Sequence, residues 1–269
     1  MRPGKFYEGV LSVTEQPKPR RGELSVPRRE NSETLANRVV SYLREHIAAE
    51  GLRPGARLPS EAKICSTLGI SRPIVREALR TLAATGLIEM AMGKRAQVSA
   101  LDGAVLQSVI ENAVLTGQAD VWHVMEMRRG IEISMAGLAA ERRSEKMVGE
   151  LTAIVERMSG KLDKIKDYTE LDMRFHLALA EAADNPLYLM LIEACRQIFE
   201  TSMLIGIERW SETPELSRVQ QLHEGILAAV AAGDSVAASQ AMAQHFDNAV
   251  RVMFGSRPVE APPLPVDAG

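Results

Sequence analysis

From about residue 103 to residue 255 the apolar side chains recur only at helical spacing, and this pattern is the strongest constraint on the fold. Aromatic residues make up only 4% of the chain, whereas Ala, Leu, Met and Glu are plentiful, which favours helices packed on helices over a β-sandwich. Breaks rich in Gly, Pro and Asn divide the pattern into six or seven helices, with expected spans of 104–116, 119–143, 145–165, 167–184, 186–209, 213–232 and 234–254. We therefore expect an all-α helical bundle over residues 104–255.

Residues 32–100 show a different order of elements. Apolar residues at helical spacing from Leu35 predict a first helix that stops before Gly51. Ser60 is placed to cap a second, short helix that runs to about Thr67. Ser71 is placed to cap a third, which runs to about Thr85. Two short apolar runs, 87–92 and 96–99, flank a basic turn that contains Gly and predict a β-hairpin. Three helices followed by a hairpin are the elements of a winged helix-turn-helix domain.

The third helix carries a stripe of arginines. Arg72, Arg76 and Arg80 are spaced i, i+4 and i+8, so they share one face of the helix. The second helix of a helix-turn-helix enters the major groove with its N-terminal residues first, and an arginine fork can grip guanine or phosphate. The candidate DNA-binding residues are Ser71, Arg72, Arg76 and Arg80, with Lys94 and Arg95 at the hairpin tip. The alternative interpretation is an ordinary solvated helix face.

Charge is distributed unevenly along the chain. Residues 32–100 contain ten Lys or Arg against six Asp or Glu, whereas residues 101–269 contain 15 against 25. A basic front and an acidic back indicate that only the front approaches a polyanion such as DNA. Residues 1–31 and 256–269 lack apolar periodicity, and we expect a disordered N-terminal arm and a flexible tail. Two well-separated cysteines, no membrane-spanning run and no signal peptide favour a cytoplasmic protein.

Three histidines and one aspartate in the helical part form a candidate metal site. Asp172 and His176 are four residues apart and therefore lie on one helix face, which leans inward. His223 and His245 lie on apolar stretches of two further helices. Imidazole and carboxylate ligands suit Zn²⁺, Ni²⁺, Mn²⁺ or Fe²⁺. The alternative is that each histidine is a hydrogen-bonded core or boundary residue.

The N-terminal part resembles the DNA-binding domain of the GntR family of transcription regulators over roughly residues 35–99. The motifs that carry the resemblance are Arg53-Pro54-Gly55-Ala56-Arg57-Leu58-Pro59-Ser60-Glu61, the stretch from Leu68 to Leu79, Gly86-Leu87-Ile88 and the Gly93 wing. The resemblance implies that Arg72, Arg76 and the wing tip contact operator DNA.

Residues 104–250 resemble the ligand-sensing FCD domain of the FadR subfamily. The motifs are Glu126 to Glu132, Leu138 to Glu141, Asp172 to His176, Asn185-Pro186, His223 with Gly233-Asp234, and His245. The resemblance implies that Asp172, His176, His223 and His245 bind a divalent metal, with Zn²⁺ or Ni²⁺ favoured. It further implies a small carboxylate effector, such as a sugar acid, a hydroxy acid or a dicarboxylate. Arg128 lies where the family places an arginine near the effector; the alternative for Arg128 is a surface ion pair with Glu132.

The expected protein is therefore a homodimeric regulator, and more specifically a repressor, that binds palindromic double-stranded DNA. Two other classes remain open at this point: an effector-independent DNA-binding protein with a helical dimerisation domain, and a helical metalloenzyme. A zinc protease would be expected to show His-Glu-x-x-His and a di-iron bundle paired Glu-x-x-His motifs; the chain contains neither. We therefore expect no enzymatic activity.

Overall fold

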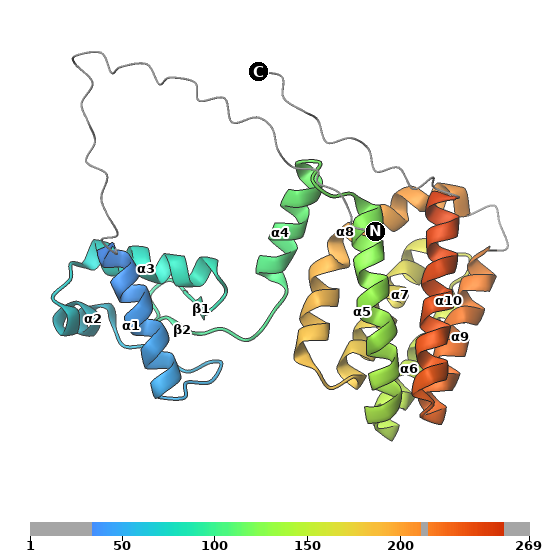
Figure 1. Ribbon diagram of the computed structural model, residues 1–269, viewed down its shortest axis with the longest axis horizontal. Helices are drawn as coiled ribbons and strands as arrows, with labels where there is room; N and C mark the ends of the chain where they lie inside the picture. The colour runs from blue at the N-terminus through green and yellow to red at the C-terminus, as the bar shows by residue number, and fades with distance from the viewer. Residues whose placement is uncertain (1–33, 211–214, 256–269) are drawn as a thin grey trace, which may run out of the picture.

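The computed structural model describes residues 34–210 and 215–255 (Figure 1). Within these ranges the chain forms ten helices and one two-stranded antiparallel sheet. The buried apolar side chains form one cluster in the winged part and a large and a small cluster in the helical part. The predicted fold class, a winged helix-turn-helix followed by an all-α bundle, is confirmed. The predicted N-terminal arm and C-terminal tail lie outside the described residues.

The winged part contains three helices and a short hairpin. They are α1 (Leu35–Ala49), α2 (Glu61–Leu68), α3 (Arg72–Ala84), β1 (Ile88–Glu89) and β2 (Gln97–Val98). The Ser60 hydroxyl accepts a hydrogen bond from Lys63 N and so caps α2, and Gly69 ends α2 in the left-handed conformation at φ 66°. Leu43, Ile64 and Leu82, one from each helix, are fully buried and join the three helices in one core.

Two local details of the winged part differ from the sequence prediction. Ser71 does occupy the N-cap position of α3, but its side chain accepts no hydrogen bond from that helix. The strands are also shorter than predicted, with two residues each. The segment before α2 supplies additional pairing: Arg57 bridges Gln97 in antiparallel fashion, and Leu58 N donates to Ala96 O. Tertiary pairing with this loop therefore stabilises the wing, which a hairpin alone would not achieve.

The second part consists of seven helices. They are α4 (Ala104–Leu115), α5 (Val121–Arg142), α6 (Glu145–Ser159), α7 (Ile165–Ala182), α8 (Pro186–Trp210), α9 (Glu215–Ala232) and α10 (Ser235–Phe254). Helix α6 ends at Ser159, well before the predicted residue 165. Gly160 forms its C-cap, and a turn follows. Among the described residues no helix combines the length and the apolar character that a membrane span requires.

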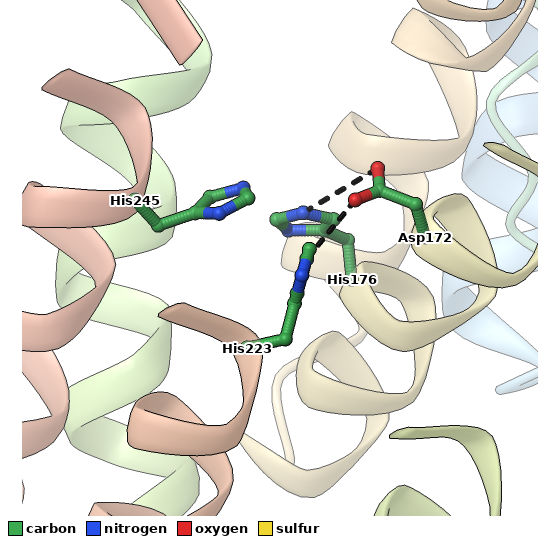
Figure 2. A group of neighbouring side chains, drawn as sticks. All are labelled: Asp172, His176, His223 and His245. Carbon is green, nitrogen blue, oxygen red and sulfur yellow. Dashed lines mark ion pairs between the residues drawn. The ribbon is translucent and has the colours of Figure 1, made fainter. Parts of the chain in front are cut away.

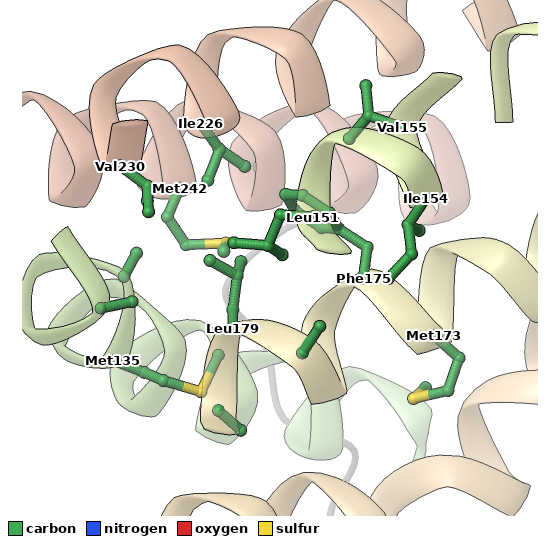
Figure 3. Close-up of a cluster of buried hydrophobic side chains, with 14 of the residues drawn as sticks. Met135, Leu151, Ile154, Val155, Met173, Phe175, Leu179, Ile226, Val230 and Met242 are labelled. Carbon is green, nitrogen blue, oxygen red and sulfur yellow. The ribbon is translucent and has the colours of Figure 1, made fainter. Parts of the chain in front are cut away.

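Five helices meet at the centre of the bundle core, to which α8 also contributes Ile192 and Phe199. Figure 3 shows its central cluster, which is aliphatic and rich in methionine and includes Met135, Leu151, Phe175, Ile226 and Met242. These five side chains come from α5, α6, α7, α9 and α10 in turn, and each is fully buried. Since interiors are close-packed, the five helices are held at fixed separations. The polar side chains on their inner faces are consequently also held in place.

Candidate DNA-binding face and metal centre

The α3 helix presents one buried and one exposed face. Val75, Ala78, Leu79 and Leu82 are buried in the winged core, whereas Arg72, Arg76 and Arg80 are all exposed. The helical period separates the two sets, because residues three or four apart share a face. The arginine stripe is therefore free of the core and available to a ligand.

Of the three arginines in the stripe, Arg76 forms an ion pair with another described residue. Its Nε donates to both carboxylate oxygens of Glu61, at 3.2 and 3.0 Å. Glu61 is the first residue of α2, so this ion pair joins the two helices of the helix-turn-helix. The local sequence pattern does not indicate this ion pair, because the two residues are 15 positions apart.

Lys94 and Arg95 are exposed at the tip of the wing. Gly93 precedes them with φ of +72°, a left-handed conformation that glycine adopts without strain. Lys94 N donates to Ala91 O and closes the turn. Exposed cations on a closed turn can reach a polyanion without disturbing the fold.

Asp172, His176, His223 and His245 come together inside the bundle (Figure 2). One potential ligand atom from each residue lies within 4.8 Å of those of the other three. Asp172 and His176 project from α7, His223 from α9 and His245 from α10. All four are buried, with exposed fractions from 0% to 6%. His223 Nε2 lies 3.0 Å from Asp172 Oδ1, and His176 Nε2 lies 3.9 Å from Asp172 Oδ2.

Buried polar atoms that face this centre lack hydrogen-bond partners among the described residues. They are Asp172 Oδ2, His176 Nε2, His223 Nε2 and His245 Nδ1. A buried polar group without a partner is costly, and each such group calls for an explanation. Two of the imidazoles have a partner for the other ring nitrogen, Nδ1. His223 Nδ1 lies 3.0 Å from Val219 O, and His176 Nδ1 contacts Glu132 Oε2. This arrangement leaves each Nε2 with a lone pair for a cation, so the donor set fits a divalent metal.

The electrostatics of the centre favour an ionised Asp172 and a neutral His245. Burial raises the pKa of Asp172, but its close contact with His223 and the charges of the three histidines outweigh burial and lower the pKa overall. Burial lowers the pKa of His245 well below its usual value, and the charges of His223 and His176 lower it further. Deprotonated carboxylate and neutral imidazole are the forms that bind metal.

Arg128 lies beside the same centre. Its side chain is 1% exposed, and its guanidinium carbon lies 4.4 Å from the ring centroid of Phe199 and 5.6 Å from that of Phe246. Its Nε donates to Glu132 Oε1 at 2.7 Å. Its two terminal nitrogens are buried and have no hydrogen-bond partner among the described residues. The ion pair with Glu132, which the sequence analysis considered only at the surface, is in fact fully buried.

One small cavity unites these groups. Its lining includes Arg128, Asp172, His176, His245 and Phe199. A guanidinium, potential metal ligands and aromatic rings thus line the same cavity. Three further polar residues near the centre were not among the predicted site residues. They are Glu132, Tyr168 and Gln220, and all three are buried in the bundle.

Comparison with known proteins identifies the two parts of the chain. Residues 35–98 match the family "Bacterial regulatory proteins, gntR family", and residues 123–248 match the FCD domain. The HTH-type transcriptional regulator LutR of Bacillus subtilis is 32% identical over 207 residues, which are 76% of this chain and 94% of LutR.

Two further relatives extend the comparison. The HTH-type transcriptional repressor NanR of Salmonella arizonae is 30% identical over 165 residues, which are 60% of this chain and 61% of NanR. A GntR structure from Streptococcus agalactiae shares the fold, with a TM-score of 0.61 at 24% identity over 81% of this chain and 99% of that one. The matched families comprise transcription regulators and not enzymes. This chain therefore belongs to the GntR family of bacterial transcription regulators, with a DNA-binding helix-turn-helix domain followed by an effector-binding FCD domain.

Proposed function

We propose that the protein is a repressor whose affinity for operator DNA is controlled by a small carboxylate bound beside a metal ion in the FCD domain. The observation that carries this proposal is that Asp172, His176 and His245 line the same cavity as Arg128 and offer buried ligand atoms that lack a hydrogen-bond partner in the described part of the chain. The name of NanR, a transcriptional repressor, supports the direction of control. In this proposal the protein acts in the cytoplasm as a homodimer on palindromic DNA.

Asp172, His176, His223 and His245 would hold the metal. Three neutral imidazoles and one carboxylate suit Zn²⁺ or Ni²⁺, and Mn²⁺ or Fe²⁺ are accepted by similar ligands. A metal bound here supplies a Lewis-acid anchor for a carboxylate or hydroxyl oxygen. The protein contributes an enclosed cavity around it, because the four ligands are buried and Phe199 and Phe246 are among the lining residues.

Arg128 would bind the carboxylate of the effector. Its terminal nitrogens are two parallel donors without partners among the described residues, and a carboxylate accepts such a pair in a bidentate manner. Sugar acids, hydroxy acids and dicarboxylates combine this carboxylate with a second oxygen. A binding site so enclosed favours small effectors.

The DNA-binding half of the proposal places α3 in the major groove, with Ser71, Arg72, Arg76 and Arg80 toward the bases and phosphates. Lys94 and Arg95 of the wing would contact the adjacent backbone or minor groove. Arg72→Ala is expected to weaken binding to the specific operator by about 1–3 kcal/mol. The measurement is a titration of labelled operator at fixed salt, with Arg44→Ala, an exposed arginine on α1, as the control. Equal effects of the two substitutions would remove Arg72 from the residues that read the sequence.

The effector half is tested by His223→Ala. This variant is expected to lose the metal and the response to carboxylates but to bind operator as the metal-free wild-type protein does. Metal content by mass spectrometry and operator titration with and without a panel of carboxylates measure both properties. Stoichiometric metal in the variant would contradict the ligand assignment. Operator binding that ignores every carboxylate in the metal-loaded wild-type protein would favour the alternative, an effector-independent DNA-binding protein.

A further inference from the structure

Glu132 is the most deeply buried acidic residue beside the cavity and has two different partners. It is 0% exposed and lies on α5, one helical turn after Arg128. Its Oε1 accepts from Arg128 Nε at 2.7 Å, and its Oε2 contacts Nδ1 of His176 on α7. A single carboxylate therefore connects two groups that line the cavity, the arginine and a metal-ligand histidine.

The first partner is held in a defined orientation. Because Glu132 engages Nε, the terminal nitrogens of Arg128 remain without hydrogen-bond partners among the described residues. The rings of Phe199 and Phe246 limit rotation of the guanidinium, whose carbon lies 4.4 and 5.6 Å from their centroids. An arginine held in this way presents a ready-made fork to a carboxylate, so little rotamer entropy is lost on binding.

The second partner is held in a defined tautomer. A carboxylate at Nδ1 of His176 favours a proton on that nitrogen, which leaves the lone pair on Nε2. Nε2 faces the cluster and has no hydrogen-bond partner within the described ranges.

We propose that Glu132 is a positioning residue that orients both halves of the effector site at once: His176 toward the metal and Arg128 toward the carboxylate of the ligand. This inference rests on the proposed function, since it takes the cluster as the metal site and Arg128 as the carboxylate receptor. Glu132 itself touches neither ligand. Its contribution is that the two receptors, which come from different helices, keep one fixed geometry.

Glu132→Gln tests the proposal because glutamine has the same size but carries only one acceptor oxygen. It cannot accept hydrogen bonds from Arg128 and His176 through two oxygens. Two affinities are measured: that for Ni²⁺ alone, by competition with a chromophoric chelator, and that of the Ni²⁺-saturated protein for acetate, by calorimetry against a chloride control. Glu126→Gln, an exposed carboxylate on the same helix, is the matched control.

The expected result is a loss in both affinities. Glu132→Gln should weaken Ni²⁺ binding by about 10–100-fold, the range for the outer partner of a metal-bound histidine, and acetate binding by roughly tenfold. Glu126→Gln should change neither affinity. A folded Glu132→Gln variant that loses only one of the two affinities, or neither, overturns the proposal. Wild-type protein that binds no Ni²⁺ would instead overturn the proposed metal centre itself, so the two failures are distinguishable.

A second measurement uses the wild-type protein and so does not depend on folding of the variant. Long-range ¹H–¹⁵N correlation spectra of the metal-free protein and of the Zn²⁺-loaded protein report which ring nitrogen of each histidine carries the proton. The proposal requires a protonated Nδ1 and a metal-bound Nε2 for His176. Coordination through Nδ1 of His176 would overturn it.

Discussion

Arg128 and Arg129 are neighbours on α5 that form ion pairs of nearly equal length in different surroundings. Arg128 Nε lies 2.7 Å from Glu132 Oε1, and Arg129 Nε lies 2.8 Å from Asp247 Oδ1. The side chains of the first pair are 1% and 0% exposed, whereas those of the second are 40% and 62% exposed. Substituting each arginine by methionine, which keeps most of the apolar stem, therefore isolates the effect of burial.

The two substitutions should differ in magnitude. Removal of one partner from a buried pair costs about 3–5 kcal/mol, because the remaining charge stays buried. Arg128→Met also removes two buried nitrogens without partners among the described residues, which returns about 1–3 kcal/mol. The net loss expected for Arg128→Met is about 2 kcal/mol. Arg129→Met should cost less than about 1 kcal/mol, because water screens the exposed pair.

Urea unfolding of the metal-free protein, followed by tryptophan fluorescence, measures the difference. Both tryptophans, Trp122 and Trp210, belong to helices of the FCD domain, so the signal reports this domain and not the winged part. The difference between the free energies of unfolding of the two variants should become smaller as the pH falls below 4.5, the usual pKa of the Glu132 carboxyl. The reason is that the pair with Arg128 lowers this pKa and stabilises the fold only where the carboxylate is ionised. A loss for Arg129→Met equal to or larger than that for Arg128→Met would refute the reasoning.

Three further predictions concern other parts of the molecule. A Cβ at Gly103 would lie 2.8 Å from backbone atoms of α8, so Gly103→Ala should lower the free energy of unfolding by about 1–3 kcal/mol in the same assay. Gly130→Ala is the control, because a Cβ there would have nothing within 4 Å and should not destabilise the fold. Equal free energies of unfolding for the two variants would contradict the packing argument. The stability of the metal-free protein should decline as the pH falls below 6.5, because burial keeps the pKa of His245 below that usual value and the unfolded chain then binds more protons. A flat profile of thermal unfolding from about pH 7.5 to about pH 5.5, roughly one unit either side of the usual histidine pKa, would contradict this. Glu61→Gln should change stability by less than about 1 kcal/mol, because the pair with Arg76 is largely exposed, and should strengthen binding to non-specific DNA by removing a negative charge beside the DNA-binding face; weaker binding would count against that placement.

Local signals sufficed to predict most of the fold. Helical periodicity identified all seven helices of the bundle, because burial on one side of a helix leaves its mark every three or four residues. Ser60 and Gly69 predicted the ends of α2, since capping depends on neighbouring residues only. The wing strands are shorter than predicted, and the bridge from Arg57 to Gln97 was not predicted because the two residues are distant in sequence.

The candidate metal site was predictable only in part. The sequence shows that Asp172 and His176 share one helix face and that His223 and His245 lie among apolar residues. The grouping of all four residues rested on the family resemblance. Nothing in the local pattern indicated that Glu132 contacts His176, which is 44 positions away. Nor did it show whether the ion pair of Arg128 is exposed or buried.

The sequence alone determined the identity of the elements and the chemical types available: an arginine stripe, a basic wing, and a set of imidazoles with one carboxylate. Only the tertiary structure decided which of these face one another and how dry their surroundings are. The physical reason is that periodicity and capping are properties of neighbours along the chain. The energy of an ion pair such as that of Arg128 with Glu132 depends instead on the helices packed around it, since burial removes the water that would otherwise screen it.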